Sequence, residues 1–331
     1  MNDRAVSILE QYDIEIVRTK KGRGAILCEG RQGLYILKEF TGSKEKAAML
    51  DLLLTRLGES CPVPVDSVLK NKDGELITVD ADGSKYMVKT WFEGRECNVR
   101  DPEECERAVR TLASLHNSMI LGEQPLLEGF PVFSLQKEYE RHNKELKKVR
   151  RFLREKSQKT EFELFLNSHF DSFLEQAVQI LEDYSSYVEL EKEEDIRKQG
   201  VLCHGDYQYH NILVTGQEMS VINFEKFVLD QPVRDLYLFM RKILEKSNWS
   251  QTIGERLLQA YDEVRPISAG SWITLCYRFA YPEKFWKIAN FYYNSGKAWI
   301  PGKNMEKLQK VLQQEQEKQK FLDEVLRKVH R

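Results

Sequence analysis

Long apolar runs are missing from this chain of 331 residues, and none approaches the roughly 18 apolar residues that a membrane-spanning helix needs. The first residues, MNDRAVSILEQYDIEIV, carry charges early on. They lack the apolar stretch followed by small residues that marks a secretory signal. We therefore expect a protein that is made and folded in the cytoplasm and that does not enter a membrane.

An excess of one charge sign is also missing. The chain has 50 Lys and Arg against 52 Asp and Glu, a net charge of −2 and a pI near 6.4, with both signs mixed along it. Such a balance creates no overall field that would draw the protein to nucleic acid. We expect no nucleic-acid partner.

Cysteine is sparse, and its spacing excludes the usual paired metal ligands. No CxxC occurs among the six cysteines, which are Cys28, Cys61, Cys97, Cys105, Cys203 and Cys276. A hydrophobic content of 41% in a chain of this length supports a core without disulfides. We therefore expect reduced thiols rather than disulfides or zinc ligands.

What is present in the first 92 residues is the pattern of a small, mostly antiparallel sheet. Strand-like runs are expected over residues 14–19, 25–29, 34–40, 75–80 and 85–92, with a helix over 43–57. Gly22 and Gly24 lie in the first turn, where glycine suits a plain hairpin and can also offer backbone N–H groups to a phosphate. Lys38 lies in the third run, where a solvent-facing side chain is the alternative to a binding role.

From residue 93 the chain is mostly helical. Residues 134–198 are strongly charged and predict two long amphipathic helices, whose charged side we interpret as solvated, with a partner surface as the alternative. A strand-loop-strand pattern interrupts the helices near residues 201–224. A long polar helix is expected over 305–330, and the chain has no internal repeat.

The stretch LCHGDYQYHNILVTGQEMSVINFEKF carries the strongest chemical signal. Phosphoryl transfer needs a carboxylate to orient the hydroxyl, oxygen ligands for a metal, and a cation on the transferring charge. Asp206 supplies the carboxylate, and Asn211, five residues later, supplies a carbonyl oxygen. The spacing predicts a loop that turns both side chains toward one phosphate.

The order of lysine strand, helix, sheet, helical region and HGDxxxxN loop resembles the aminoglycoside phosphotransferase and choline kinase superfamily over nearly the whole chain. Residues 223–246 and the aromatic-rich residues 277–301 are similar to CotS-type spore coat proteins. The resemblance implies a location in the spore coat, with other coat proteins, a nucleotide and a small-molecule acceptor as partners.

The fold that the resemblance implies is α+β and bilobal, a protein kinase-like (aminoglycoside phosphotransferase-like) fold. A small antiparallel β-sheet lobe that binds nucleotide would cover residues 1–92, and a large, mainly helical lobe would cover 93–331. The second lobe would hold the catalytic-type loop at 204–211 and a helical insertion at about 134–198.

The resemblance also assigns roles to single residues. Lys38 matches the lysine that holds the nucleotide phosphates, and Asp206 matches the catalytic base. Glu45 is the first candidate for the carboxylate partner of Lys38 and Asp51 the second, with an exposed acidic residue as the alternative. Gly22 and Gly24 match the loop over the phosphates.

Further roles follow from the same match. Backbone groups near Lys89, Thr90 and Trp91 match the hinge that bonds adenine. Asp235 matches a structural aspartate that braces the catalytic loop, and His204 is expected to support that loop by hydrogen bonds.

Asn223 is where the sequence departs from the pattern, because a working family member carries there the aspartate that binds magnesium. An asparagine keeps one oxygen donor and loses a full negative charge, which weakens the binding of a hard cation. Glu225 would point to the same side of a strand as Asn223 and reach the same metal, with a surface glutamate as the alternative. ATP and Mg²⁺ are the implied cofactors, with Asn211, Asn223 and Glu225 as metal ligands.

Three functions stay open on this evidence. The favoured one is a spore coat protein that is a degenerate or atypical phosphotransferase. The others are an active ATP- and Mg²⁺-dependent kinase of a small-molecule hydroxyl, on a sugar or an amino alcohol, and a nucleotide-binding pseudokinase. The aromatic residues of the second motif form either a packed core or an acceptor cleft or docking patch; they are Tyr281, Phe285, Trp286, Tyr292 and Trp299.

Overall fold

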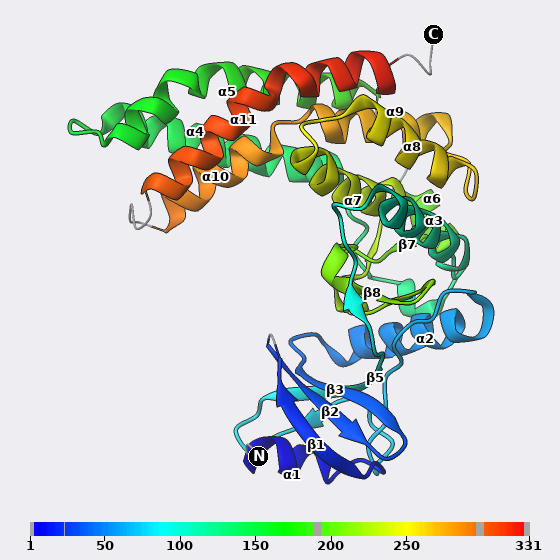
Figure 1. The fold of residues 1–331 in the computed structure, drawn as a ribbon. Helices are drawn as coiled ribbons and strands as arrows, with labels where there is room; N and C mark the ends of the chain where they lie inside the picture. The colour runs from blue at the N-terminus through cyan, green and yellow to red at the C-terminus, as the bar shows by residue number, and fades with distance from the viewer. Residues whose placement is uncertain (1–2, 23, 188–192, 296–300, 328–331) are drawn as a thin grey trace. The chain divides into compact units, whose positions relative to one another are not determined.

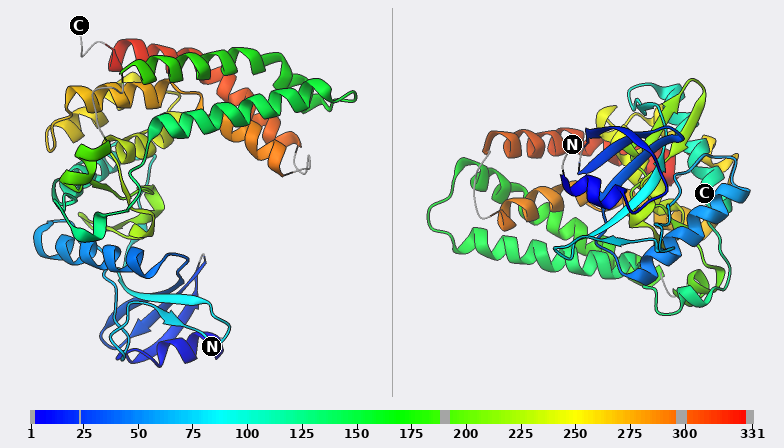
Figure 2. Two further views of the ribbon diagram at one scale, coloured as in Figure 1. Left: turned by 180° about the vertical axis from the view of Figure 1, so that it is seen from behind. Right: turned by 90° about the horizontal axis from the view of Figure 1, so that it is seen from below.

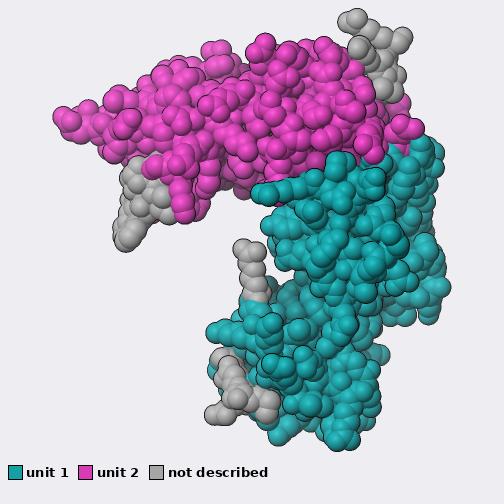
Figure 3. Space-filling view, viewed as in Figure 1, with its two compact units in different colours: residues 1–131, 197–239, 260–266 teal, residues 132–196, 240–259, 267–331 magenta. Residues whose placement is uncertain are grey.

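The computed structural model describes residues 3–22, 24–187, 193–295 and 301–327. The chain divides into two compact units, coloured separately in Figure 3. Unit 1 comprises residues 1–131, 197–239 and 260–266, and unit 2 comprises residues 132–196, 240–259 and 267–331. The two units are not the two expected lobes, because unit 1 continues past residue 92. The lobe boundary expected at residue 92 stays a prediction.

A five-stranded antiparallel sheet opens unit 1, as the sequence predicts, in the order β1-β2-β3-β5-β4. Its strands are β1 (Ile16–Lys21), β2 (Ala25–Gly30), β3 (Gly33–Glu39), β4 (Thr78–Val79) and β5 (Lys85–Trp91). Helix α1 (Asp3–Leu9) lies along one face of the sheet (Figures 1 and 2). There Ile8 packs in a buried cluster with Leu37 and Val88. Because side chains alternate along a strand, Lys38 lies on the opposite face of β3 from Leu37.

Helix α2 (Lys44–Ser60) follows β3 in the chain and ends later than the expected Leu57. Ser43 caps it, because its side chain accepts a hydrogen bond from the backbone N–H of Lys46 at 3.2 Å. The helix buries a leucine-rich side and ends just before Pro62, which disfavours helical geometry in the residue before it.

The rest of unit 1 combines helices with two small sheets. The expected strand-loop-strand pattern is present, and β6 pairs with β8 while β10 pairs with β7. The elements are β6 (Arg95–Glu96), α3 (Pro102–Ser118), η1 (Pro125–Leu127), α6 (Glu193–Gln199), β7 (Leu202–Cys203), η3 (Tyr209–Asn211), β8 (Ile212–Thr215), β9 (Glu218–Val221), η4 (Phe224–Lys226), β10 (Val228–Leu229) and the start of α7 (Val233–Lys246).

Unit 2 is helical. The charged stretch forms α4 (Leu135–Glu155) and α5 (Glu161–Tyr187), which run side by side in Figures 1 and 2 and bury their apolar sides in one core. The other elements are α8 (Gln251–Asp262), α9 (Ala269–Ala280), α10 (Glu283–Asn294), α11 (Pro301–Phe321) and a π-helical turn, η5 (Leu322–Leu326). Among the described residues, no helix is both long and apolar enough to cross a bilayer.

The aromatic-rich motif belongs to the core of unit 2. Tyr281, Phe285 and Tyr292 are buried there, and Tyr281 stacks on Tyr139 with ring centroids 3.9 Å apart. The packed-core interpretation is therefore confirmed for these residues. Trp286 is partly buried against the same core, and Trp299 lies outside the described residues.

The cysteines are thiols, as the sequence predicts. Burial raises the pKa of Cys28 and of Cys276 to about 11, so both stay protonated near neutral pH. Neither thiol has the lowered pKa that marks a reactive cysteine.

A buried histidine makes the stability of unit 2 depend on pH. His142 is fully buried on α4, and its ring stacks on Trp286 with centroids 3.4 Å apart. Its Nε2 accepts a hydrogen bond from Arg141 at 3.0 Å. Burial is the main cause that lowers the pKa of His142 to about 4, and Arg141 lowers it further.

We expect acidification to destabilise unit 2 through this group. Between pH 6.5 and about 4 the unfolded chain protonates His142 while the folded chain does not, so stability falls as the pH falls. The loss between pH 7.5 and pH 5.0 should be about 2 kcal/mol. Urea unfolding at both pH values would measure it, and His142→Phe, which keeps an aromatic ring on Trp286, should lose about 2 kcal/mol less than wild type over that interval. An equal loss in both proteins would contradict the prediction.

Candidate active site

The HGDxxxxN stretch forms the loop between β7 and β8, and a glycine makes its path possible. Gly205 has a φ of 78°, in the left-handed region that favours glycine. A Cβ atom at this position would collide with the backbone carbonyl oxygen of Lys226. The loop and the segment around Lys226 therefore approach each other as closely as backbone atoms allow.

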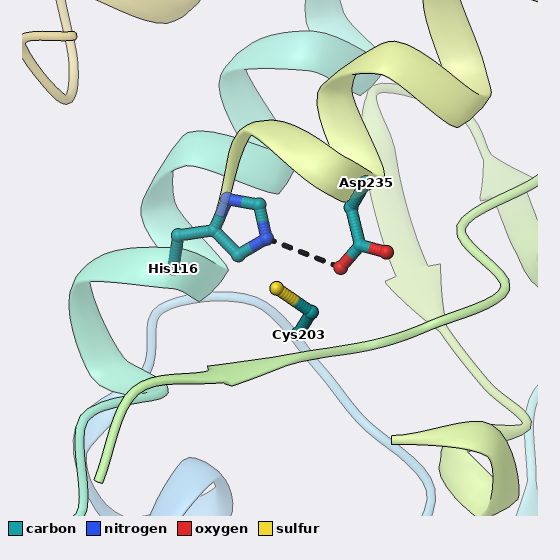
Figure 4. Close-up of side chains that lie close together, drawn as sticks. All are labelled: His116, Cys203 and Asp235. Carbon is teal, nitrogen blue, oxygen red and sulfur yellow. Dashed lines mark hydrogen bonds and ion pairs between the residues drawn. The ribbon is translucent and has the colours of Figure 1, made fainter. Parts of the chain in front are cut away.

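Asp235, at the start of α7, bonds the backbone of this loop through its carboxylate. Its carboxylate accepts hydrogen bonds from the backbone N–H groups of His204 at 2.6 Å and Gly205 at 2.9 Å. His116 Nε2 lies 3.3 Å from the same carboxylate, as Figure 4 shows, and the Tyr261 hydroxyl lies 2.8 Å from His116 Nδ1.

The protonation states of this pair follow from their burial. Burial lowers the pKa of His116, so the ring is neutral, donates through Nε2 and accepts from Tyr261. Burial alone would raise the pKa of Asp235, but the hydrogen bond from His116 holds that pKa below its ordinary value. Asp235 is an ionised, fully bonded brace.

Cys203 joins His116 and Asp235 in a buried group of residue types that also bind metals (Figure 4). The Sγ of Cys203 lies 3.2 Å from the backbone carbonyl oxygen of Asp230 and 3.1 Å from that of Gln231, so its single S–H is shared between them. Since the polar atoms of the group already hold the loop and its neighbours, its role here is structural.

The loop presents Asp206 and Asn211 together. Asn211 donates from Nδ2 to the backbone carbonyl of Asp206 at 2.8 Å. The Asp206 carboxylate, one quarter exposed, pairs with Lys226 at 2.8 Å. His204 supports the loop as expected, because its Nδ1 accepts from the backbone N–H of Asp206 at 3.2 Å.

Asn223 lies between Lys38 and Asn211. Lys38 Nζ donates to Asn223 Oδ1 at 2.8 Å, and Asn223 Nδ2 donates to Asn211 Oδ1 at 2.8 Å. The backbone N–H of Asn223 donates to Asp66 at 3.1 Å. The structure thus joins the predicted phosphate lysine, both predicted asparagines and the predicted base in one continuous chain of contacts.

The expectation that residues 223 and 225 lie along a strand is wrong. Asn223 is left-handed, with φ 69° and ψ 52°, and residues 224–226 form the 3₁₀ turn η4. Asparagine tolerates this backbone conformation better than most residues. Glu225 still reaches the site, but it does so by this turn and not by strand alternation.

Glu225 belongs to a cluster of charges around Lys89. The resemblance assigns Lys89 only to the hinge that bonds adenine. Lys89 is fully buried and pairs with Asp66 and with Glu225. Glu225 also pairs with Lys38 at 3.4 Å. No local pattern indicated this role, because Lys89 lies in an apolar strand and Asp66 in a proline-rich connection.

The ionisation of the cluster is set by burial against pairing. Burial opposes the charged forms, but Lys89 and Lys38 lower the pKa of Glu225 to about 2. Asp66 and Glu225 likewise overcome burial and raise the pKa of Lys89. The pKa of Lys38 shifts in the opposite direction and is lowered. Burial is the main cause and the neighbouring Lys89 adds to it, while Glu225 opposes the shift.

The remaining predicted residues lie apart from this group. Glu45 is exposed in the first turn of α2, where it bonds Ser43, and Lys38 pairs with Glu225 instead. Gly22 and Gly24 line a pocket of about 500 Å³ together with Leu37, on the α1 side of the sheet. The nucleotide-binding roles predicted for Glu45, Gly22 and Gly24 stay predictions.

The predicted hinge residues already take part in hydrogen bonds and strand pairing. Thr90 N donates to Ser67 O at 2.9 Å, and Thr90 Oγ1 accepts from Ser67 N at 2.8 Å. Trp91 is half-buried at the end of β5 and pairs with Leu34 of β3. Adenine binding by Thr90 and Trp91 stays a prediction.

The donor set does not fit Mg²⁺ as it stands. Lys38 has only N–H donors, so the oxygen of Asn223 must face it and the amide NH₂ must face Asn211. Asn211 is fixed in the same way by the carbonyl of Asp206. The oxygens of both asparagines therefore accept N–H groups, and Glu225 Oε1 faces two ammonium groups, so a magnesium ion would have to compete with these donors.

A five-stranded sheet that carries Lys38, followed by an HGDxxxxN loop that meets an Asn-Phe-Glu turn, defines a protein kinase-like fold of the small-molecule phosphotransferase type. Aminoglycoside phosphotransferase from Alicyclobacillus acidocaldarius has the same fold, with a TM-score of 0.83 at 21% identity over 98% of this chain and 95% of that one. Spectinomycin phosphotransferase in complex with ADP and spectinomycin has a TM-score of 0.64 at 13% identity over 94% and 93%. The predicted bilobal kinase-like fold is confirmed.

The chain belongs to the family described as "Spore coat putative kinase YutH", whose model matches residues 5–325. Spore coat protein S of Bacillus subtilis (strain 168) is 24% identical over 326 residues, which cover 94% of this chain and 89% of that protein. These matches confirm the resemblance to CotS-type spore coat proteins and the expected assignment to the spore coat.

Proposed function

We propose that this spore coat protein is an atypical phosphotransferase-fold protein that binds a nucleotide and has lost efficient metal-dependent phosphoryl transfer. The observation that carries the proposal is Asn223, an uncharged amide held between Lys38 and Asn211 where a transferase of this fold has a metal-binding aspartate. Transfer relies on cations that neutralise the developing charge, and this position supplies no carboxylate to hold one.

Each part of the site has a role in nucleotide binding. Lys38, one quarter exposed, can turn from Asn223 to a phosphate oxygen. Gly22 already donates its N–H to Ala25 at 2.8 Å, and Gly22 and Gly24 line a pocket on the α1 side of the sheet, so neither is part of the proposed phosphate contact. The backbone near Thr90 and Trp91 would bond adenine. Asp206 would orient an acceptor hydroxyl toward the terminal phosphate. Other coat proteins are the proposed partners outside this site.

Calorimetric titration with ATP in the presence of Mg²⁺ tests nucleotide binding. We expect wild type to bind and Lys38→Ala to bind at least tenfold more weakly, a loss of about 1.4 kcal/mol or more, because an ammonium group on the phosphates is removed. Lys44→Ala is the matched control, since Lys44 is 79% exposed in the same sheet-bearing part of unit 1, and its affinity should stay within about twofold of wild type.

Two results would count against the proposal. Absence of binding at millimolar ATP would leave a coat protein built on a kinase-like fold without a nucleotide. Equal losses in Lys38→Ala and Lys44→Ala would place the nucleotide away from Lys38.

The second candidate function is an active kinase of a small-molecule hydroxyl, and Asp206 favours it. Its carboxylate is partly exposed and is held by a loop whose hydrogen bonds are complete. An active kinase would consume ATP only with the correct acceptor, and Asp206→Asn would abolish that consumption while leaving ATP binding intact. A screen of sugars and amino alcohols with both proteins separates the two functions.

A further inference from the structure

Ammonium groups neutralise the carboxylates of the candidate site. Glu225 faces Lys38 and Lys89, Asp66 faces Lys89, and Asp206 faces Lys226. The site thus holds as many lysines as carboxylates, and Asn211 and Asn223 add no charge. A site with an aspartate at 223 would carry one more negative charge and would need a cation to balance it.

The amides form a relay with one possible direction. Lys38 donates to Asn223, Asn223 donates to Asn211, and Asn211 donates to the backbone carbonyl of Asp206, each at 2.8 Å. The relay starts at a group that can only donate and ends at a group that can only accept. Each amide is therefore locked in orientation, and an N–H fills the space between the two asparagine oxygens.

We propose that this site binds the polyphosphate of a nucleotide without a divalent cation, with the ammonium groups of Lys38 and Lys226 in the neutralising role. The inference rests on the proposed nucleotide binding and concerns how the phosphates are held. The Asn223 amide supplies the bridge to Asn211 that a metal ion would otherwise make between two oxygens.

The position of Lys226 supports its part in the proposal. It lies beside Asp206, its side chain is 69% exposed, and its backbone is fixed against Gly205. A flexible ammonium group on a fixed backbone can move from a carboxylate to a phosphate that binds beside it. Lys89 cannot do so, because it is buried between Asp66 and Glu225.

Titration of the full chain with ATP in EDTA and in excess Mg²⁺ tests the inference. We expect the affinity of wild type in EDTA to stay within about threefold of that in Mg²⁺. Asn223→Asp places two oxygens opposite Asn211, so it should lose at least about tenfold in EDTA and recover with Mg²⁺. Asn248→Asp is the matched control, because Asn248 is also left-handed, with a φ of 53°, and is exposed outside the site; it should behave as wild type.

A second variant tests the lysine. Lys226→Gln should weaken ATP binding in EDTA at least about fivefold and leave AMP binding unchanged, because AMP lacks the outer phosphates. An equal loss for ATP and AMP would overturn the role of Lys226.

The outcomes separate the inference from the proposed function. If wild type binds ATP in Mg²⁺ and loses tenfold or more in EDTA, the inference is wrong and nucleotide binding stands. If wild type binds ATP in neither condition, both are wrong.

Discussion

Replacing Lys89 with methionine should lower the free energy of unfolding of unit 1 by roughly 3–5 kcal/mol, the cost of removing one partner of a buried ion pair. Asp66 is fully buried, and its Oδ1 has no hydrogen-bond partner among the described residues. After the substitution only the backbone N–H of Asn223 would remain on its carboxylate. Glu225 would keep Lys38, so the main loss comes from Asp66.

A double-mutant cycle identifies the cause. Asp66→Asn removes the charge that Lys89 balances, so Lys89→Met combined with Asp66→Asn should regain at least half of the loss. Lys44→Met is the control, because Lys44 and Glu75 form an exposed pair at 3.9 Å whose removal should cost less than about 1 kcal/mol. Denaturant unfolding and hydrogen exchange of β5 amides are measured for wild type, both single variants, the double variant and the Lys44→Met control. A loss below 1 kcal/mol for Lys89→Met would show that water or another group replaces the ammonium.

The parts of the site that the sequence predicts are those carried by short-range spacing. HGDxxxxN fixes the distance between Asp206 and Asn211 through a single loop, and the structure places the two side by side. Asp235 was expected to brace that loop and does so through two backbone N–H groups. The strand around Lys38 also allows a solvent-facing side chain, and the phosphate role of Lys38 comes from the resemblance alone. The structure places Lys38 against Asn223.

The parts that the sequence does not predict depend on long-range pairing or on an unusual backbone. Lys89 and Asp66 are 23 positions apart. They meet because the connection that contains Asp66 pairs with both β5 and β9. Glu225 was expected to bind metal from a strand, but the left-handed Asn223 starts a 3₁₀ turn that directs it to two lysines. Strand alternation cannot anticipate such a turn.

The same division explains the uncertain partner of Lys38. Glu45 and Asp51 were chosen because a helix follows the lysine strand, and helical position alone cannot say which carboxylate reaches Lys38. The structure gives that place to Glu225, far along the chain. Charge balance around Lys38 and Lys89 therefore comes from the η4 turn and from Asp66, and α2 contributes a capped, exposed acidic residue instead.

Replacing Asp235 with asparagine should destabilise unit 1 by roughly 3–5 kcal/mol, because a buried acceptor of charged hydrogen bonds is lost. The aspartate receives N–H groups from His204, Gly205 and His116. An asparagine has one oxygen for these three donors, and its NH₂ group would face at least one of them. The hydrogen bonds cannot all be rebuilt by rotating the amide.

The effect should be concentrated in the catalytic-type loop, which distinguishes loss of a brace from general destabilisation. In Asp235→Asn, the amide protons of His204 and Gly205 should exchange with solvent faster by a larger factor than those of β2 and β3. Glu263→Gln is the control, because Glu263 pairs with Arg110 on the surface of the same unit with both side chains 44% exposed, and it should cost less than about 1 kcal/mol. Uniform acceleration across unit 1 would mean that Asp235 stabilises the fold as a whole. Acceleration confined to the loop would instead show that Asp235 acts as a local brace, which holds Asp206 and Asn211 in the relay with Asn223.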